Sequence, residues 1–308
     1  MKLGLSIGSF TWPGGPEAIA PTLARIAVAA EAAGFDSLWV MDHLLQIRFL
    51  GEPDEPMLEG VTTLGWLAAR TERVTLGLLV GGVPYRPAGI WLKAATTLDV
   101  LSGGRAWFGI GAAWNEEEAH ALGIPFPPLA DRFALLEETL RLVRAGWTGP
   151  AGTRAPLHGR HVRAEEILNA PQAIARPHPP ILVGGGGEER TLRLVARYAD
   201  ACNVFGSPEQ IRHKFAVLRR RCEEEGRDPA TIERTNLVHL GVSVDGTPRT
   251  LGPAALLDRL AAYAEAGSHH AILALRDAHE IATLELIGRE VIPHLRGLGE
   301  PSPLAARP

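Results

Sequence analysis

The chain has 308 residues, a hydrophobic content of 46% and a formal net charge of -4 at pH 7. These values predict one soluble domain with an ample core, and the acidic balance gives no basic footprint for nucleic acid. No apolar run approaches the roughly 20 residues that a membrane span needs, and no secretory signal is expected. Cys202 and Cys222 form no CxxC motif, so we expect a reduced, cytoplasmic protein.

Short β-rich runs alternate with segments of helical periodicity along the whole chain. The predicted strands cover residues 3–8, 37–41, 74–80, 106–110, 181–184, 201–205, 236–244 and 271–275. Apolar residues between them recur at helical spacing, as in 22–33 and 256–266. Continuous hydrophobicity within the strands indicates a parallel sheet that is covered on both faces. Eight strand-plus-helix units favour a (β/α)8 TIM barrel, with a doubly wound open sheet as the alternative.

One interval interrupts this alternation. Residues 148–180 contain several glycines and prolines and little periodicity, so we expect an insertion loop between strands 4 and 5. The insertion has too few apolar residues for a core of its own, and residues 1–298 are therefore predicted to form a single domain. Residues 299–308 are proline-rich and are expected to form a flexible tail.

Two strand ends carry residues suited to chemistry or binding. The second strand runs into Asp42 and His43, and an imidazole at this end of a barrel can move a proton or hydrogen-bond a ligand. A structural Asp beside a packed His is the alternative. The fifth strand runs into a glycine loop directly before a helix, where N–H groups can surround an anion. This loop is predicted to bind phosphate, with a purely structural turn as the alternative.

Several catalytic motifs are missing from the sequence. It contains no GxSxG elbow, no phosphate loop of the GxxxxGK[ST] type and no HExxH zinc helix. Gly109-Ile110-Gly111 begins like a dinucleotide fingerprint, but Trp114 stands at the third glycine position. The sequence therefore predicts neither a metal site nor a Rossmann-type nucleotide site.

These features together resemble the luciferase-like superfamily of flavin- and deazaflavin-dependent oxidoreductases. The matching segments are residues 42–43, 76–87, 94–105, 108–138, 179–187, 190–192 and 199–203. The similarity covers nearly the whole chain and is greatest to the branch assigned to coenzyme F420. It implies that F420, with FMN as the alternative, binds at the carboxyl ends of the barrel strands.

The resemblance also implies the site residues. A non-proline cis peptide near Leu79 and Val80 would support the central ring of the cofactor, and Asp42 and His43 would be the catalytic residues beside it. Cofactor contacts are implied at Leu79, Val80, Gly81, Gly111, Asn115, Gly184, Gly185, Gly186, Gly187, Asn203, Phe205 and Gly206. Arg190 is the cation nearest to the glycine loop in sequence, so backbone groups are expected to provide most of the phosphate recognition.

The implied activity is hydride transfer between F420 and a small organic substrate. The alternatives are an FMN-dependent, two-component monooxygenase served by a partner reductase and a non-catalytic flavin-binding barrel. A homodimer is expected, without nucleic-acid or membrane partners. Some deazaflavin-dependent sugar-phosphate dehydrogenases have a carboxylic acid after the Gly-x-Gly of the fourth strand, where this chain has Trp114 and Asn115. This departure disfavours a sugar phosphate and leaves His43 as the candidate proton carrier.

Overall fold

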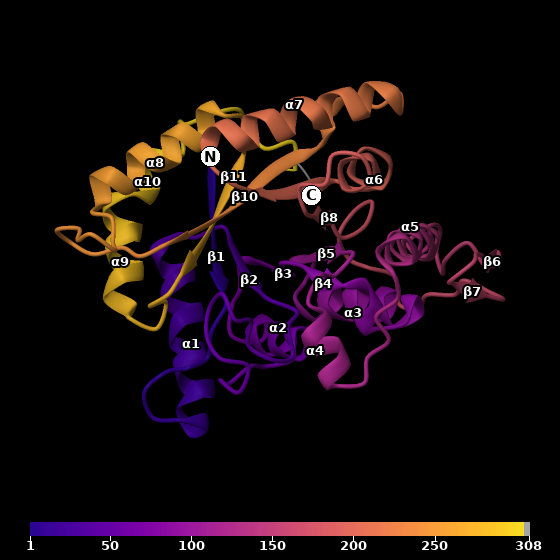
Figure 1. Cartoon of the computed structure of the whole chain (residues 1–308), viewed down its shortest axis with the longest axis horizontal. Helices are drawn as coiled ribbons and strands as arrows, with labels where there is room; N and C mark the ends of the chain where they lie inside the picture. Colours follow the sequence, from indigo (N-terminus) through magenta and orange to yellow (C-terminus); the bar gives the residue numbers. More distant parts are fainter. Residues whose placement is uncertain (305–308) are drawn as a thin grey trace.

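The computed structural model describes residues 1–304 and contains a closed barrel of eight parallel strands (Figure 1). The order around the ring is β1, β2, β3, β5, β8, β9, β10 and β11, and β11 pairs back with β1. In that order the strands span Lys2–Ile7, Ser37–Val40, Thr75–Leu78, Ala106–Gly111, Ile181–Gly184, Ala201–Phe205, Glu233–Leu240 and His270–Leu275. Closure of the ring confirms the predicted (β/α)8 barrel and removes the open-sheet alternative.

Helices surround the barrel and cover the outer faces of its strands (Figure 1). They are α1 (Pro16–Ala33), α2 (Gly60–Ala68), α3 (Ala88–Leu101), α4 (Glu116–Ala121), α5 (Leu129–Gly146), α6 (Thr191–Tyr198), α7 (Pro208–Glu224), α8 (Pro253–Glu265), α9 (Ile281–Glu290) and α10 (Ile292–Leu295). Around the barrel, α1 packs against α9, and α6 packs against α7. In the described part of the chain, none of these helices has the length and hydropathy to cross a bilayer.

The third barrel strand ends before its predicted boundary. A cis peptide joins Leu79 to Val80, at the place implied by the family resemblance. Pairing with β5 then resumes at the short strand β4 (Gly81–Gly82), which continues into a 3-10 turn over Val83–Tyr85. The chain therefore bulges between β3 and β4 at the carboxyl end of the barrel.

Residues 148–180 form the expected excursion between the fourth and fifth barrel strands. It contains one hairpin, β6 (Leu157–His158) with β7 (Arg163–Ala164). The excursion is fixed to α3, because the Asp99 carboxylate accepts hydrogen bonds from the N–H groups of Ile174 and Ala175 at 2.6 and 3.0 Å. The apolar residues of the excursion join the main hydrophobic core and do not form a second one.

The segment expected to be a tail begins at Gly299. Its described part, residues 299–304, lies against the amino-terminal end of the barrel. Leu304 is 9% exposed and packs with Trp39 and Trp107 from the barrel interior, and the Ser302 hydroxyl donates to Glu233. Residues 305–308 lie outside the described residues.

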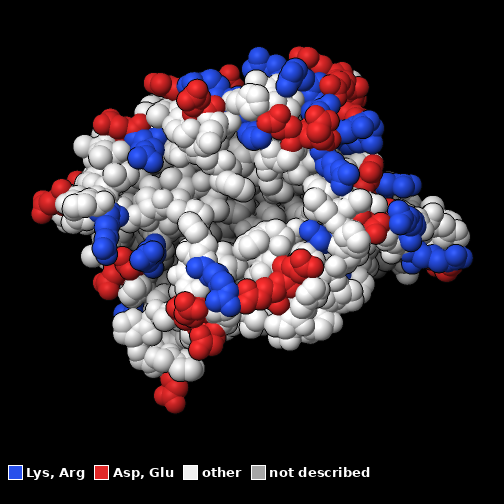
Figure 2. All heavy atoms as spheres, viewed as in Figure 1, with Lys and Arg blue, Asp and Glu red and all other residues white. Residues whose placement is uncertain are grey.

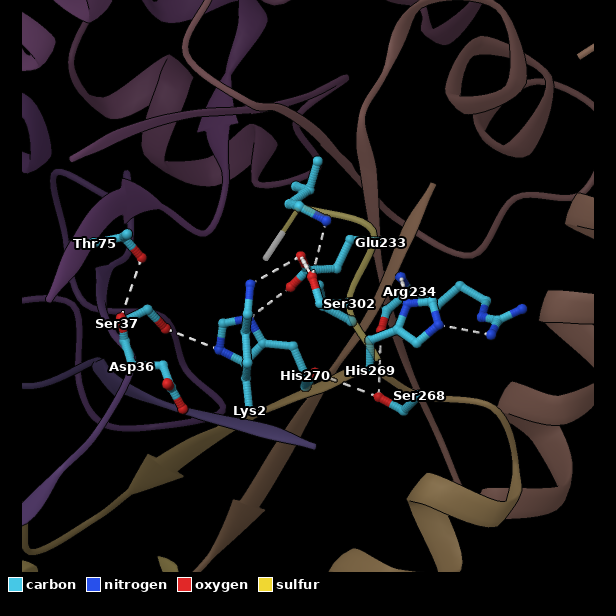
Figure 3. A network of polar contacts seen from close by, with 12 residues as sticks. Lys2, Asp36, Ser37, Thr75, Glu233, Arg234, Ser268, His269, His270 and Ser302 are labelled. Carbon is cyan, nitrogen blue, oxygen red and sulfur yellow. Dashed lines mark hydrogen bonds and ion pairs between the residues drawn. The ribbon is translucent and has the colours of Figure 1, made fainter. Parts of the chain in front are cut away.

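A buried polar network closes this amino-terminal end of the barrel (Figure 3). The Glu233 carboxylate lies 3.2 Å from His270 Nδ1 and accepts a hydrogen bond from Lys2 Nζ at 3.2 Å. His270 Nε2 in turn lies 2.9 Å from the Ser37 hydroxyl. Burial raises the pKa of Glu233, but the contacts with His270, Lys2 and Ser302 outweigh it and hold the pKa at about 2. An ionised carboxylate therefore joins β1, β10 and β11 at neutral pH.

His269 lies beside this network and titrates differently in the folded and unfolded chain. Burial, followed by the charge of Arg234, lowers the pKa of His269 from 6.5 to about 4. The unfolded chain therefore binds a proton that the folded chain excludes, and the free energy of unfolding falls as the pH drops from about 6.5 to about 4. The loss is on the order of 2–3 kcal/mol.

We predict that His269→Gln removes this part of the pH dependence, because glutamine keeps an acceptor for the Arg234 amide but does not titrate. Denaturant unfolding at several pH values between about 7 and about 4 measures it. His294→Gln, at an exposed position on α10, should retain the wild-type slope. An unchanged slope in His269→Gln would contradict the assignment.

Candidate active site

The predicted site residues lie at the carboxyl ends of five barrel strands. Asp42 and His43 follow β2, the cis peptide follows β3, Gly111 ends β5, the glycine loop follows β8, and Phe205 ends β9. Parallel strands point in the same direction, so these residues share one rim of the barrel. This is the end where ligands bind and catalytic groups gather in (β/α)8 proteins.

Asp42 is buried and fully engaged by its neighbours. Its two carboxylate oxygens accept hydrogen bonds from the Arg86 guanidinium, each at 2.8 Å, and one of them also accepts from the Gly82 N–H at 3.0 Å. Arg86 also contacts Glu59 and lies over the Trp91 ring at 4.5 Å from its centroid. Asp42 therefore ties the end of β2 to β4 and to the turn that follows it.

His43 faces a buried carboxylate that the sequence analysis did not identify. His43 Nδ1 lies 2.7 Å from Glu118 Oε2, although the two residues are 75 positions apart in the chain. The same oxygen accepts from the Tyr85 hydroxyl at 2.9 Å and from Asn115 Nδ2 at 3.3 Å. The other oxygen accepts from the N–H groups of Leu44 and Leu45. Glu118, from α4, therefore connects the loop after β2 with the segment after β4.

The protonation of this pair follows from its surroundings. Burial raises the pKa of Glu118, but the hydrogen bonds from His43 and the two loop amides outweigh it and lower the pKa. Burial and the neighbouring Glu118 raise the pKa of Tyr85, which keeps its hydroxyl as a donor. An ionised carboxylate only accepts hydrogen bonds, so His43 must carry a proton on Nδ1. In this tautomer the remaining ring nitrogen, Nε2, is the one that can accept a proton.

Glycines shape the space around the Val80 bulge. A Cβ at Gly184 would lie 2.8 Å from both methyl carbons of Val80, and one at Gly111 would lie 3.0 Å from the nearer methyl. A Cβ at Gly109 would overlap the carbonyl oxygen of Leu78, and one at Gly81 would lie 2.6 Å from Trp91. The glycines at the ends of β5 and β8 are therefore required for the bulge itself. Gly111, Gly184 and Val80, all predicted site residues, are brought together.

The rest of the glycine loop has donors without protein acceptors. Gly185 has φ +119° and donates its N–H to the carbonyl of Asn203 at 3.0 Å. Across residues 1–304, the N–H groups of Gly186, Gly187 and Glu188 donate to no protein acceptor. The Thr191 hydroxyl, at the start of α6, borders the loop, 2.9 Å from where a Gly187 Cβ would lie. These neighbouring free donors are suited to an anion.

The predicted residues at the end of β9 differ in their exposure. Asn203 is buried and donates through Nδ2 to the Thr235 hydroxyl at 2.8 Å, so its side chain lies inside the barrel wall. Gly206 has φ +136°, and its carbonyl accepts a hydrogen bond from the Tyr263 hydroxyl at 3.0 Å. Phe205 is exposed. Phe205 is therefore the accessible side chain among the predicted residues at this strand end.

Exposed aromatic side chains border the catalytic rim. Trp114 is 64% exposed, and its ring stands edge-on to the His43 ring with centroids 5.4 Å apart. Phe49, 72% exposed, reaches from the loop after β2 to His239 on β10, with ring centroids 5.3 Å apart. Figure 2 shows a hollow near the middle of the molecule whose visible walls are mainly uncharged, with Lys, Arg, Asp and Glu gathered around its edge. The exposed ring of Trp114 gives His43 an apolar neighbour that a ligand can reach.

A cavity of about 530 Å³ lies at the opposite, amino-terminal end of the barrel. It is lined by the starts of the strands and by residues of the 299–304 segment. Its cations are already bound: Lys2 by Glu233, Arg296 by Asp36 at 2.8 Å, and Arg105 by carbonyls at the ends of α2 and α3. These cations are engaged by the protein itself, and we do not assign catalysis to this cavity despite its size. Within residues 1–304, no cluster of His, Cys, Asp and Glu is arranged to hold a metal ion.

Two functional candidates were missed at the sequence level. Glu118 follows two other glutamates at the start of α4, and only the direction of the helix decides which of them is buried. Lys214, on α7, lies against the glycine loop, with its Cε 3.6 Å from where a Cβ of Gly186 would be. Local sequence patterns contain no signal for either contact.

Comparison with known proteins gives a consistent family. A family model described as luciferase-like monooxygenase matches residues 1–283. The chain is 32% identical over 233 residues to a protein of Kineococcus radiotolerans named F420-dependent glucose-6-phosphate dehydrogenase, covering 73% of this chain and 65% of the relative. The chain thus spans slightly less than two thirds of that relative's length.

Solved structures agree in fold. An F420-dependent secondary alcohol dehydrogenase in complex with an F420-acetone adduct has a TM-score of 0.80 at 17% identity, covering 96% of this chain and 99% of that one. A riboflavin lyase with modified FMN also has a TM-score of 0.80 at 15% identity, covering 98% and 93%. These low identities establish the shared barrel alone.

We predict that Glu118→Gln reverses the tautomer of His43. The N–H groups of Leu44 and Leu45 will continue to donate to the side-chain oxygen at position 118. The NH2 group of the new glutamine then points toward His43 Nδ1. Nδ1 must then accept, and the proton moves to Nε2. Nitrogen-15 NMR of the imidazole distinguishes the two forms. Glu117→Gln, the neighbouring exposed glutamate paired with Arg48, should leave His43 as in the wild type. A wild-type imidazole spectrum in Glu118→Gln would refute the pairing.

Proposed function

The chain belongs to the luciferase-like monooxygenase family, and from this membership we propose that it is an F420-dependent oxidoreductase acting on a small, uncharged organic substrate. The observation that carries the proposal is the buried His43–Glu118 pair at the carboxyl rim, close in the fold to the Val80 bulge. The name of the Kineococcus relative supports F420 as the cofactor.

The rim fits a cofactor with a planar ring and a phosphate. The bulge between β3 and β4 offers Val80, Gly81 and their backbone to the ring, and the glycine loop offers unsatisfied N–H groups to the phosphate. Phe205 and the Gly206 backbone lie at the next strand end, and Asn115 is held at Glu118. When bound, such a cofactor supplies the hydride donor or acceptor; the protein contributes binding, orientation and the exclusion of water.

His43 is the group that moves a proton. Hydride transfer to or from a carbon atom requires a proton to reach or leave the neighbouring heteroatom or carbon. Nε2 of His43 is available for that proton, and the Glu118 carboxylate stabilises the imidazolium that forms when Nε2 accepts it. Asp42 has a supporting role in this proposal, because Arg86 and the Gly82 amide occupy its oxygens.

The substrate is proposed to be uncharged at the end that meets His43. Trp114 places an exposed indole against the imidazole, and the nearby Arg48 is paired with Glu117 and Glu52. A phosphate at this point would lie against the aromatic wall of Trp114. An alcohol, a carbonyl compound or an activated double bond with an apolar substituent fits this surface.

The FMN-dependent monooxygenase is the second candidate. FMN has a single phosphate that the glycine loop also suits, and a structural neighbour carries modified FMN. Such an enzyme would draw reduced flavin from a partner reductase. A homodimer and a cytoplasmic location also remain proposals; the two buried, unpaired cysteines, Cys202 and Cys222, fit a reducing compartment.

We predict micromolar or tighter binding of F420 and at least about tenfold weaker binding by Gly186→Asp, because its carboxylate adds repulsion beside the free N–H groups. Gly186 tolerates a side chain, since its Cβ would meet only Lys214 Cε at 3.6 Å. Gly186→Asn, similar in size but uncharged, should bind far better than Gly186→Asp. Fluorescence titration with F420 and FMN measures both. Tight FMN binding with no detectable F420 binding would replace the proposal by the monooxygenase.

We predict that His43→Ala lowers kcat by about 10²–10⁴-fold, with little change in F420 affinity, since Nε2 carries the proton. The assay compares small ketones and secondary alcohols with glucose 6-phosphate in the F420-dependent reaction. Turnover should be confined to the uncharged substrates and should weaken, through a higher KM, in Trp114→Ala. Efficient oxidation of glucose 6-phosphate would refute the substrate class, and wild-type kcat in His43→Ala would refute the proton transfer.

A further inference from the structure

A group of charged side chains stands beside the glycine loop on α7. Lys214 Nζ donates to Glu188 Oε1 at 2.6 Å, and His213 Nε2 lies 3.0 Å from the same oxygen. Lys214 lies on α7, 26 residues beyond Glu188 in the chain. The fold therefore adds a cation where the sequence suggested only Arg190.

The Glu188 carboxylate occupies the position of an anion. The Glu188 N–H is one of the free donors of the loop, and its carboxylate is 34% exposed. The ion pairs with Lys214 and His213 lower the pKa of Glu188, so the carboxylate is charged at neutral pH. An ion pair that water can reach contributes little to stability, so a second anion can replace Glu188 at little cost.

The other charges around this group are balanced or face elsewhere. Arg221 donates to the Glu188 carbonyl at 3.1 Å and pairs with Glu189 and Glu224. The Arg190 guanidinium lies over the Phe133 ring, 5.5 Å from its centroid. Lys214 is thus the cation whose partner, Glu188, is both half-exposed and adjacent to the free N–H groups.

We propose that Lys214 and His213 form a second anion subsite, next to the glycine loop, which binds a carboxylate from the acidic tail of the cofactor after displacing Glu188. The proposal rests on the F420-dependent function proposed above. It assigns the phosphate to the N–H groups of the loop and the extension beyond the phosphate to α7. FMN ends at its phosphate and has no group for this subsite, so Lys214 favours the deazaflavin.

Equilibrium binding with three ligands tests the subsite: F420 with its acidic tail, the same deazaflavin ending at the phosphate, and FMN. Lys214→Gln should weaken the binding of full-length F420 by about three- to tenfold. The truncated deazaflavin and FMN should bind to Lys214→Gln with the same affinity as to the wild type. Lys214→Arg should restore the affinity, and Glu188→Gln should increase it by removing the competing carboxylate. Arg219→Gln, which removes the same charge from an exposed position on α7, is the matched control and should change nothing.

The outcomes separate this subsite from the cofactor assignment. Failure of the wild type to bind either deazaflavin would overturn the proposed function. Wild-type binding of F420 with no loss in Lys214→Gln would overturn the subsite alone. Equal weakening of the full-length and truncated deazaflavins would also overturn it, because Lys214 would then act on the phosphate.

Discussion

The buried carboxylate of Glu118 is the contact on which the catalytic rim depends. A charge that is 1% exposed is stable only when its oxygens are satisfied, and three separate segments provide the donors. The loop after β2 contributes His43 and two amides, the turn after β4 contributes Tyr85, and the N-cap of α4 contributes Asn115. The requirement to satisfy one charge therefore fixes the position of His43, and the stability of the rim and its geometry are coupled.

The fold and half of this rim follow from the sequence because their signals are local. Strand periodicity gives the barrel, and the residues that directly follow strands, Asp42, His43 and the glycine loop, fall at its carboxyl end. The start of β10 was placed too late, at residue 236 instead of Glu233. A hydrophobic pattern excludes a carboxylate, whereas the fold buries Glu233 by pairing it with His270 and Lys2. Buried ion pairs between distant residues leave no periodic trace.

The contacts that complete the site are long-range, and the sequence alone contains no sign of them. Glu118 meets His43 across 75 residues, and the choice among three consecutive glutamates depends on the rotation of α4. The glycine loop shows a related limit. The sequence predicts that its first glycine, Gly184, belongs to an anion-binding loop. In the structure a Cβ at this position would overlap Val80, so packing already requires glycine there. One glycine run thus serves both packing and binding, and only the neighbouring strand reveals where one ends and the other begins.

The two ends of the barrel contrast in how their polar groups are satisfied, and this contrast locates function better than cavity size. At the amino-terminal end, Glu233 is saturated by His270, Lys2 and Ser302, and a ligand there would have to break existing contacts. At the carboxyl end, the N–H groups of Gly186, Gly187 and Glu188 lack protein acceptors, and Nε2 of His43 makes no hydrogen bond within residues 1–304. Unsatisfied groups gain the most from a ligand, because binding replaces water without breaking protein contacts. The carboxyl rim, with its free donors, is therefore the better candidate for catalysis than the cavity at the amino-terminal end, whatever the volume of that cavity.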